Sequence, residues 1–466
     1  MAIMGTPLRK LDLAESTFWL LDRASSMNFA VFADGIGELQ GESVKKALQW
    51  LQKKHPMLQV SILHNSDDGS LSFHSESASS LNEIKFAEST VSDDAQEFSD
   101  EVGRAIMKPF ENGEAPLMRC GLIQGPDRFR LYLIFHHSIA DGRSGIALLD
   151  SLVRRLANSE SELPDQSTDD LPAGVHERLP AGGEPEMEQK PAQALKLYQK
   201  KKGPPSASLL EIQIRPDLLT SLRSTGKANG ATLHGVLGAC LLQSLANLEA
   251  RRQAMEPATS KTSSASEVST STSSDALRMA LASPADLRGQ MSNPAADDLA
   301  LYISLITTTV DVPSLQSWEA DQASANVDSF WSLARSISQD VHHQVSDGPL
   351  DFYRMLPDPG RYLTKPDPGK AYGALIQRLP QALAFSNAGI VKDFAEPENQ
   401  SWRIQNAAFS VHPSVSQVMF VAATTYSQQL TLTIHIDANR WPDRGLKLFE
   451  EELSSVLNRL EEALSG

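Results

Sequence analysis

The stretch from Phe129 to Gly142 constrains the fold most, because it joins two hydrophobic patterns of different period through a polar turn. Its first half, residues 129–135, is rich in aromatic and β-branched residues and has the composition of a buried strand. Downstream, apolar residues recur every three or four positions, as in a helix packed on a core: Ile146, Leu149, Leu152, Val153 and Leu156. Between the two lies His-His-Ser-Ile-Ala-Asp-Gly, residues 136–142. The sequence therefore predicts a strand-to-helix connection that carries two imidazoles and a carboxylate.

These residue types suit proton transfer. Histidine has the side-chain pKa nearest to working pH, so His137 is the candidate general base, with His136 beside it. Asp141 could orient the ring directly or by bracing the loop, and Gly142 lets the backbone turn sharply or a ligand come close. A single histidine after a strand is more often a satisfied core residue. A histidine pair followed by Asp-Gly favours a site.

Helical and strand patterns alternate along the chain, which predicts an α/β fold with two lobes. The segments expected to form strands are 29–33, 58–62, 128–135, 209–214, 278–282, 303–310, 382–386, 416–423 and 430–436. The segments expected to form helices are 43–54, 94–107, 144–157, 232–249, 329–345 and 445–463.

Composition divides the chain into an N-terminal lobe (1–157), a linker (158–202) and a C-terminal lobe (203–466). The linker is rich in Pro, Gly and acidic residues and has no sustained apolar period. Within the second lobe, residues 259–274 are almost all Ser and Thr, which predicts a disordered insert.

The net charge of −16 opposes binding to nucleic acid. Cys120 and Cys240 lack zinc-type spacing, and no metal site is expected. Neither a signal peptide nor an apolar stretch long enough to cross a bilayer is present, so we expect a cytoplasmic protein without a membrane span.

The pattern His-His-x-x-x-Asp-Gly resembles the signature of the condensation-domain and acyltransferase superfamily, which includes nonribosomal peptide condensation domains and chloramphenicol acetyltransferase relatives. Shorter matches follow in order, including His-Pro-Met-Leu at 55–58, Pro-Ala-Asp-Leu-Arg at 284–288 and Phe-Ser-Asn-Ala-Gly at 385–389. The last two resemble the alcohol acyltransferase and phthiocerol dimycocerosyl transferase-like branch. The resemblance implies two chloramphenicol-acetyltransferase-like α/β sandwich lobes with a substrate tunnel between them, and it assigns catalysis to His137 and a structural role to Asp141.

Four further residues could support the site. Arg288 is expected to pair with a carboxylate such as Asp141, because a guanidinium fork suits that geometry. Asn387, next to Ser386, could donate a hydrogen bond near the reaction centre or merely form a turn. Ser144 is expected to cap the following helix rather than to contact substrate.

By resemblance, the chain is expected to be an O-acyltransferase that moves an acyl group from acyl coenzyme A or an acyl carrier protein to the hydroxyl of a small-molecule or lipid alcohol. The thioester is a co-substrate and no other cofactor is implied. Two alternatives stay open: an amide-forming freestanding condensation enzyme, and an inactive scaffold that binds a carrier protein. Family members are often monomeric, which favours a monomer.

A second match to the pattern, His342-His343 with Asp347-Gly348, has a different context. Apolar residues before it repeat at three and four positions, so this pair is expected on the polar side of an amphipathic helix that ends at Asp347-Gly348. We therefore expect no catalytic role for His343.

Overall fold

The computed structural model of the protein describes residues 6–75, 82–158, 170–179, 192–198, 203–255, 276–291, 298–313, 323–394 and 401–465. The predicted Ser/Thr-rich insert at 259–274 lies outside the described residues, and so does most of the predicted linker.

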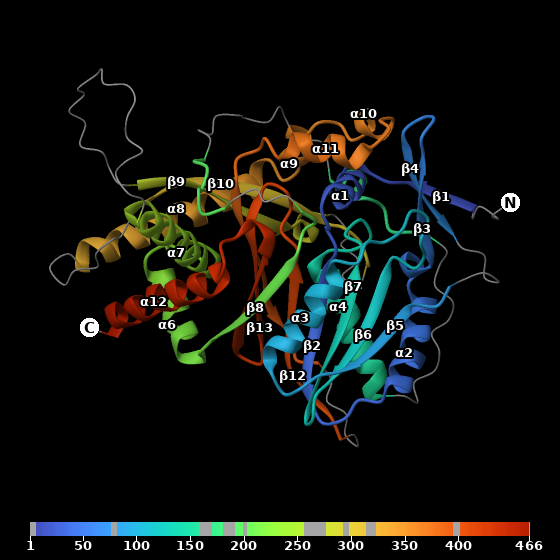
Figure 1. Ribbon diagram of the computed structural model, residues 1–466, viewed down its shortest axis with the longest axis horizontal. Coiled ribbons are helices and arrows are strands. Elements are labelled where there is room, and N and C mark those ends of the chain that lie inside the picture. Colours follow the sequence, from blue (N-terminus) through green and yellow to red (C-terminus); the bar gives the residue numbers. More distant parts are fainter. Residues whose placement is uncertain are drawn as a thin grey trace.

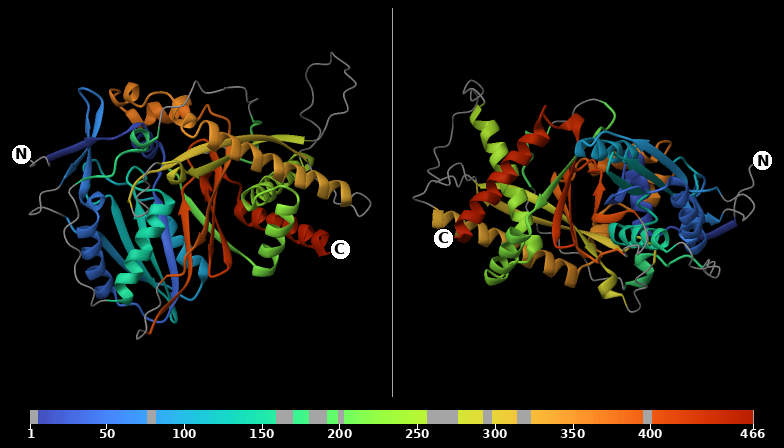
Figure 2. Two further views of the ribbon diagram at one scale, coloured as in Figure 1. Left: turned by 180° about the vertical axis from the view of Figure 1, so that it is seen from behind. Right: turned by 90° about the horizontal axis from the view of Figure 1, so that it is seen from below.

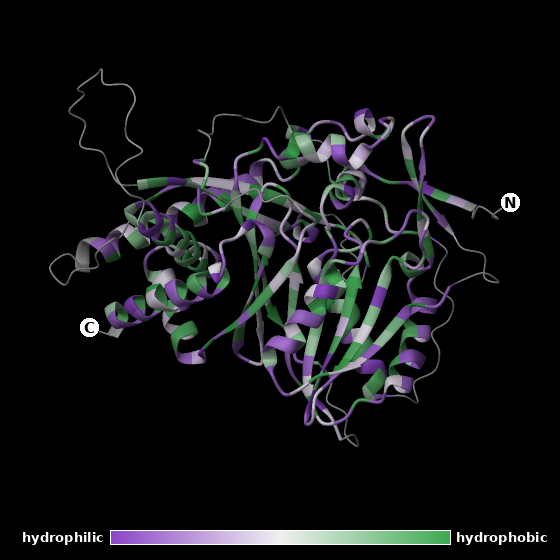
Figure 3. Ribbon diagram, in the orientation of Figure 1, coloured by the Kyte–Doolittle hydropathy of each residue, from purple (hydrophilic) through white to green (hydrophobic). Residues whose placement is uncertain are grey.

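The first lobe is built on a five-stranded sheet with helices on both faces (Figure 1). Its strands, in spatial order, are β12 (Arg403–Val411), β2 (Phe29–Ile36), β7 (Arg128–Phe135), β6 (Met118–Gln124) and β5 (Lys85–Thr90). The helices that pack on it are α2 (Gly41–Lys54), α3 (Ala95–Ile106) and α4 (Gly142–Ala157). The central strand β7 is buried from Phe129 onward and is the hydrophobic strand that the sequence predicts (Figure 3).

The second lobe is a six-stranded mixed sheet covered on its outer face by long helices (Figure 2). Its strands, in spatial order, are β10 (Ile303–Pro313), β9 (Ala276–Asp286), β11 (Ala382–Val391), β13 (Gln417–Tyr426), β14 (Gln429–Asp437) and β8 (Ala207–Ile214). The covering helices are α6 (Pro216–Ala228), α7 (Leu233–Met255), α8 (Ala323–Asp347) and α12 (Gly445–Ser465). The α/β fold with two lobes is thus confirmed.

One strand departs from the predicted division at residue 203. β12 belongs to the second half of the sequence, yet it pairs antiparallel with β2 along its whole length and forms the edge of the first sheet (Figure 1). Its other face packs against β13 and β14 of the second sheet. The lobes are therefore tied together by a shared strand, which local hydrophobic pattern could not reveal.

Smaller elements join the lobes at one end of the molecule. A three-stranded sheet contains β1 (Thr6–Lys10), β4 (Ser70–Ser75) and β3 (Val60–Asn65). The short helices are α5 (Val175–Arg178), α9 (Asp351–Met355), α10 (Gly360–Leu363) and α11 (Pro368–Ile376), with 3-10 turns at η1 (Pro56–Gln59), η3 (Arg288–Gln290) and η5 (Ala438–Arg440). Helix α1 (Leu13–Ala24) packs against α11, so the second half of the chain also braces the first lobe here.

No single helix among the described ranges is long and apolar enough to cross a membrane; only the sharply bent pair α6 and α7 passes that test jointly.

A candidate active site at the end of strand β7

The His-His-Ser-Ile-Ala-Asp-Gly segment forms the predicted turn between β7 and α4. His136 N–H donates to Leu117 O at 3.0 Å, and Ile139 N–H donates back to His136 O at 3.1 Å. Asp141 is the N-cap of α4 and forms a capping box with Ser144: each side chain bonds the backbone N–H of the other, at 2.9 and 3.0 Å. The helix start is thereby fixed relative to the histidines.

His137 is held in one orientation and one tautomer. Its Nδ1 lies 2.9 Å from the carbonyl oxygen of Ala140. A carbonyl only accepts, so in the neutral ring Nδ1 carries the proton and Nε2 keeps the lone pair. The ring contacts Phe18 and Phe29, with centroid distances of 4.4 and 4.7 Å. Burial among these rings lowers the pKa of His137 to about 4, which keeps it neutral at physiological pH.

His136 has a different environment from that of its neighbour. Its Nδ1 accepts the Ser138 N–H at 3.2 Å, while its Nε2 is buried without a hydrogen-bond partner, 3.7 Å from an Asp22 oxygen. Burial lowers the pKa of this imidazole as well. His137 Nε2 is not among the described side-chain nitrogens that are buried without a hydrogen-bond partner, so the two imidazoles differ in the surroundings of Nε2.

Asp141 braces the loop and has no hydrogen bond to His137 among the described contacts. Its two oxygens accept bonds from both terminal nitrogens of Arg288 (2.9 and 3.2 Å), from Tyr302 N–H (2.9 Å) and from Ser144 N–H. Arg288 also contacts Asp286 at 2.9 Å. Of the two roles expected for Asp141, the structure shows loop bracing, and Arg288 occupies the predicted position. The ion pair ties the β7–α4 turn to the second lobe.

Gly142 needs no special backbone conformation, since it is not among the residues with positive φ. It opens α4, and a Cβ there would touch the ring of Phe409 on β12 at 3.4 Å. Because 3.4 Å is an ordinary van der Waals distance, neither the backbone conformation nor the packing against β12 requires glycine at this position.

Ser386 and Asn387 lie on β11 where its register with β13 shifts. Asn387 Oδ1 accepts the N–H of Gly389, which has φ +75, so this side chain makes a local bond where β11 is irregular, and the segment continues as a strand instead of forming a separate turn. No described hydrogen bond joins Ser386 or Asn387 to the His137 loop. The Asn387 amide nitrogen is not engaged in a described bond either.

The second His-His-x-x-x-Asp-Gly string lies on helix α8, as expected. His342 and His343 are exposed, and His343 Nδ1 pairs with Asp347 at 3.1 Å, one turn along the helix. Both side chains of this pair are about 70 % exposed, with values of 72 and 66 %. The helix ends at Asp347.

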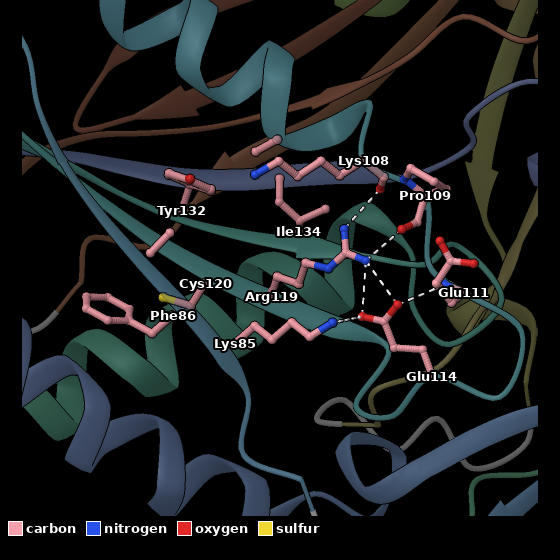
Figure 4. A pocket seen from close by; sticks show the side chains of 12 residues that line it. Lys85, Phe86, Lys108, Pro109, Glu111, Glu114, Arg119, Cys120, Tyr132 and Ile134 are labelled. Carbon is pink, nitrogen blue, oxygen red and sulfur yellow. Dashed lines mark hydrogen bonds and ion pairs between the residues drawn. The ribbon is translucent and has the colours of Figure 1, made fainter.

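A separate hollow of about 340 Å³ lies on the α3 face of the first sheet, lined by β5, β6, β7 and the segment after α3 (Figure 4). Its polar groups mostly satisfy one another. Arg119 donates to Glu114 and to the carbonyls of Lys108 and Pro109, and Lys85 pairs with the same glutamate at 2.7 Å. His137 is not among the lining residues, so we do not assign catalysis to this hollow.

Several site residues were missed by sequence reasoning. The Ala140 carbonyl is a local contact of His137 within the motif itself. The Tyr302 N–H, Phe18 and Phe29 come near Asp141 or His137 only in three dimensions. A buried polar contact between the lobes was missed in the same way. His412, just after β12, shares a 3.2 Å hydrogen bond with His435 on β14, and Ser410 on β12 bonds His435 at 3.1 Å. No spacing in the sequence marks these pairs.

Residues 19–170 match the family model of the Condensation domain. Among curated proteins, the chain is 30 % identical over 129 residues to surfactin synthase subunit 2 of Bacillus subtilis and 32 % identical over 137 residues to tyrocidine synthase 3 of Brevibacillus parabrevis. Each alignment covers 28 % of this chain, but only 3 % of the first relative and 2 % of the second.

Similar solved structures extend over nearly the whole chain. Polyketide synthase associated protein 5 from Mycobacterium tuberculosis has a TM-score of 0.62 at 16 % identity, covering 98 % of this chain and 99 % of that one. A trichothecene 15-O-acetyltransferase from Fusarium sporotrichioides has a TM-score of 0.66 at 11 % identity, covering 97 and 94 %. The first condensation domain of the calcium-dependent antibiotic synthetase has a TM-score of 0.61 at 12 % identity, covering 98 and 96 %.

The Condensation domain match is confined to residues 19–170. Over nearly its whole length, the chain shares the two-lobed, chloramphenicol-acetyltransferase-like fold of the solved acetyltransferase and condensation-domain structures.

Proposed function

We propose that the protein is an O-acyltransferase that uses His137 as general base. The single observation that carries this proposal is the 2.9 Å contact between Nδ1 of His137 and the Ala140 carbonyl, from which it follows that a neutral ring keeps its lone pair on Nε2. A neutral imidazole with one fixed nitrogen and one free nitrogen is the arrangement that a base catalyst needs.

In the proposed reaction, the acceptor hydroxyl gives its proton to Nε2 of His137 as its oxygen attacks the thioester carbonyl carbon. The tetrahedral intermediate collapses with cleavage of the C–S bond, and the departing sulfur takes the proton back from Nε2. An ester and a free thiol result. The Gly142 N–H or the Asn387 amide would stabilise the oxyanion.

For the donor we propose acyl coenzyme A or an acyl carrier protein, and for the acceptor a small-molecule or lipid alcohol. Ester formation is supported by the Asp-Leu-Arg and Ser-Asn-x-Gly segments, which resemble the alcohol acyltransferase branch, and by the fold shared with a 15-O-acetyltransferase. Amide formation is the second candidate, because the curated matches include the surfactin and tyrocidine synthases, and the chain shares its fold with a condensation domain of an antibiotic synthetase. The monomeric state and cytoplasmic location stay predictions.

The test measures thiol release from acyl coenzyme A of several chain lengths, with Ellman's reagent, in the presence of alcohols, amines or water alone. Alcohol-dependent release with an ester product supports the proposal, and amine-dependent release with an amide product supports the second candidate. No release with any donor, including acylated carrier proteins, would favour a binding scaffold.

A further inference from the structure

The imidazole of His137 contacts two aromatic rings, Phe18 and Phe29, that differ in how they are held. Phe29 on β2 is fully buried and is backed by Phe135, stacked at 5.1 Å. Phe18 on α1 is 8 % exposed and lies closest to the imidazole, at 4.4 Å and an interplanar angle of 35°. Phe29 is therefore held by a further ring behind it, whereas Phe18 is the more exposed of the two rings that contact the imidazole.

Helix α1 is locked to the catalytic loop by polar contacts at the same turn. Ser138 Oγ donates to the backbone carbonyl of Glu15 at 2.9 Å. Glu15 closes the α1 capping box with Asp12 and accepts a bidentate pair from Arg9 at 2.6 and 2.8 Å. Phe18 follows Glu15 by three residues, so it lies on the same helix face. The contact that holds the loop thus also sets the position of the ring.

We infer that Phe18 is a positioning residue for His137: it keeps the imidazole in place and keeps water away from it until the acceptor arrives. This inference rests on the proposed function. An imidazole desolvated by an aromatic cover stays neutral in mild acid, and a thioester bound beside it is protected from hydrolysis. A merely structural phenylalanine would have neither effect.

The experiment compares wild type with Phe18→Ala, Phe18→Leu and Phe18→Tyr. Phe330→Ala is the matched control, because Phe330 is a buried phenylalanine on α8 in the other lobe. Three quantities are measured: kcat/KM for transfer at pH 5 and pH 7.5, thioester hydrolysis without acceptor, and the His137 titration by NMR of histidine-labelled protein.

Removing the ring hydrates His137, so its pKa rises toward the ordinary value near 6.5 and more of the base is protonated at pH 5. We expect the ratio of kcat/KM at pH 7.5 to that at pH 5 to rise about tenfold in Phe18→Ala. The ratio of hydrolysis to transfer should rise on the order of tenfold as well. Phe18→Tyr should retain the wild-type values of both ratios. Phe18→Leu, which serves as the test if Phe18→Ala does not fold, should raise both ratios by less than the roughly tenfold increase expected for alanine.

Equal losses at both pH values with an unchanged ratio of hydrolysis to transfer, as expected for Phe330→Ala, would overturn the inference. An unchanged His137 titration in a folded Phe18→Ala protein would do the same. Failure of the proposed function would look different: the wild-type protein itself would transfer no acyl group. The effect of Phe18 on the His137 titration could still be measured by NMR in that case.

Discussion

Two segments of this chain share the string His-His-x-x-x-Asp-Gly, but they differ in every physical property that matters for chemistry. At residues 136–142 the string follows a buried strand, and both histidines are buried. At residues 342–348 it ends an amphipathic helix, and its histidines are exposed. In the first, the Asp carboxylate is fully buried and accepts four hydrogen bonds; in the second, it forms one exposed pair. A motif thus gains meaning from the element that precedes it.

The largest difference is expected in catalysis. His137→Ala removes the base and should lower kcat/KM by about 10²–10⁴-fold, the range that a general base contributes. His343→Ala, the matched substitution in the second string, should leave kcat/KM unchanged. Equal losses in the two variants, measured by acceptor-dependent thiol release, would remove the distinction between the two strings.

Asp141 and Asp347 should differ in how much each contributes to the free energy of unfolding. In Asp141→Asn an amide nitrogen must face one of the donors from Arg288, Tyr302 or Ser144, leaving a buried cation and a donor poorly satisfied. We expect a loss of about 2–4 kcal/mol in the free energy of unfolding, softened by the remaining Arg288–Asp286 contact.

Asp347→Asn is the control for this comparison and should change the free energy of unfolding by less than about 0.5 kcal/mol, because its pair is exposed. Urea unfolding of both proteins checks the contrast. A small effect of Asp141→Asn would mean that the brace between the lobes is unimportant for stability.

The buried histidines should make the protein sensitive to mild acid. The pKa of His137 is lowered to about 4 and that of His412 to about 3, both by burial. The unfolded chain therefore binds protons first as pH falls below about 6.5, and stability is lost from there down to the folded-state pKa. Between these two pKa values, each such histidine lowers the free energy of unfolding by about 1.4 kcal/mol for every unit by which the pH falls.

Urea unfolding at pH 7 and pH 5 measures this slope. In His137→Gln, the loss in the free energy of unfolding between pH 7 and pH 5 should be smaller than in wild type by about 2 kcal/mol. The same measurement on His343→Gln, at an exposed position, serves as the control. An identical slope in His137→Gln and wild type would show that the imidazole is hydrated in the folded state.

The smallest effect is expected from the His343–Asp347 pair itself. Double substitution to alanine should change the free energy of unfolding by less than about 0.5 kcal/mol, since exposed pairs one helical turn apart contribute little. A double-mutant cycle by thermal unfolding checks this. A coupling of several kcal/mol would indicate a structural or functional role for the second string.

The sequence alone determined the local architecture around the site. The apolar run at 129–135 and the three-to-four repeat after Ser144 indicate a strand and a helix with a polar turn between them, and both are present. The same reasoning placed the second string on a helix. These predictions succeeded because periodicity reports which face of one element is buried, a property set by neighbours in the chain.

Tertiary structure decided which groups meet. Arg288 was linked to Asp141 through resemblance and side-chain chemistry, but its second contact with Asp286 and the N–H of Tyr302 were not foreseen. The contact of Phe18 with His137 and the pairing of β12 with the first sheet also had no signal in the sequence. These two features and the Tyr302–Asp141 bond depend on elements that pack across long separations in the chain, where burial and hydrogen bonding are settled jointly and leave no periodic pattern.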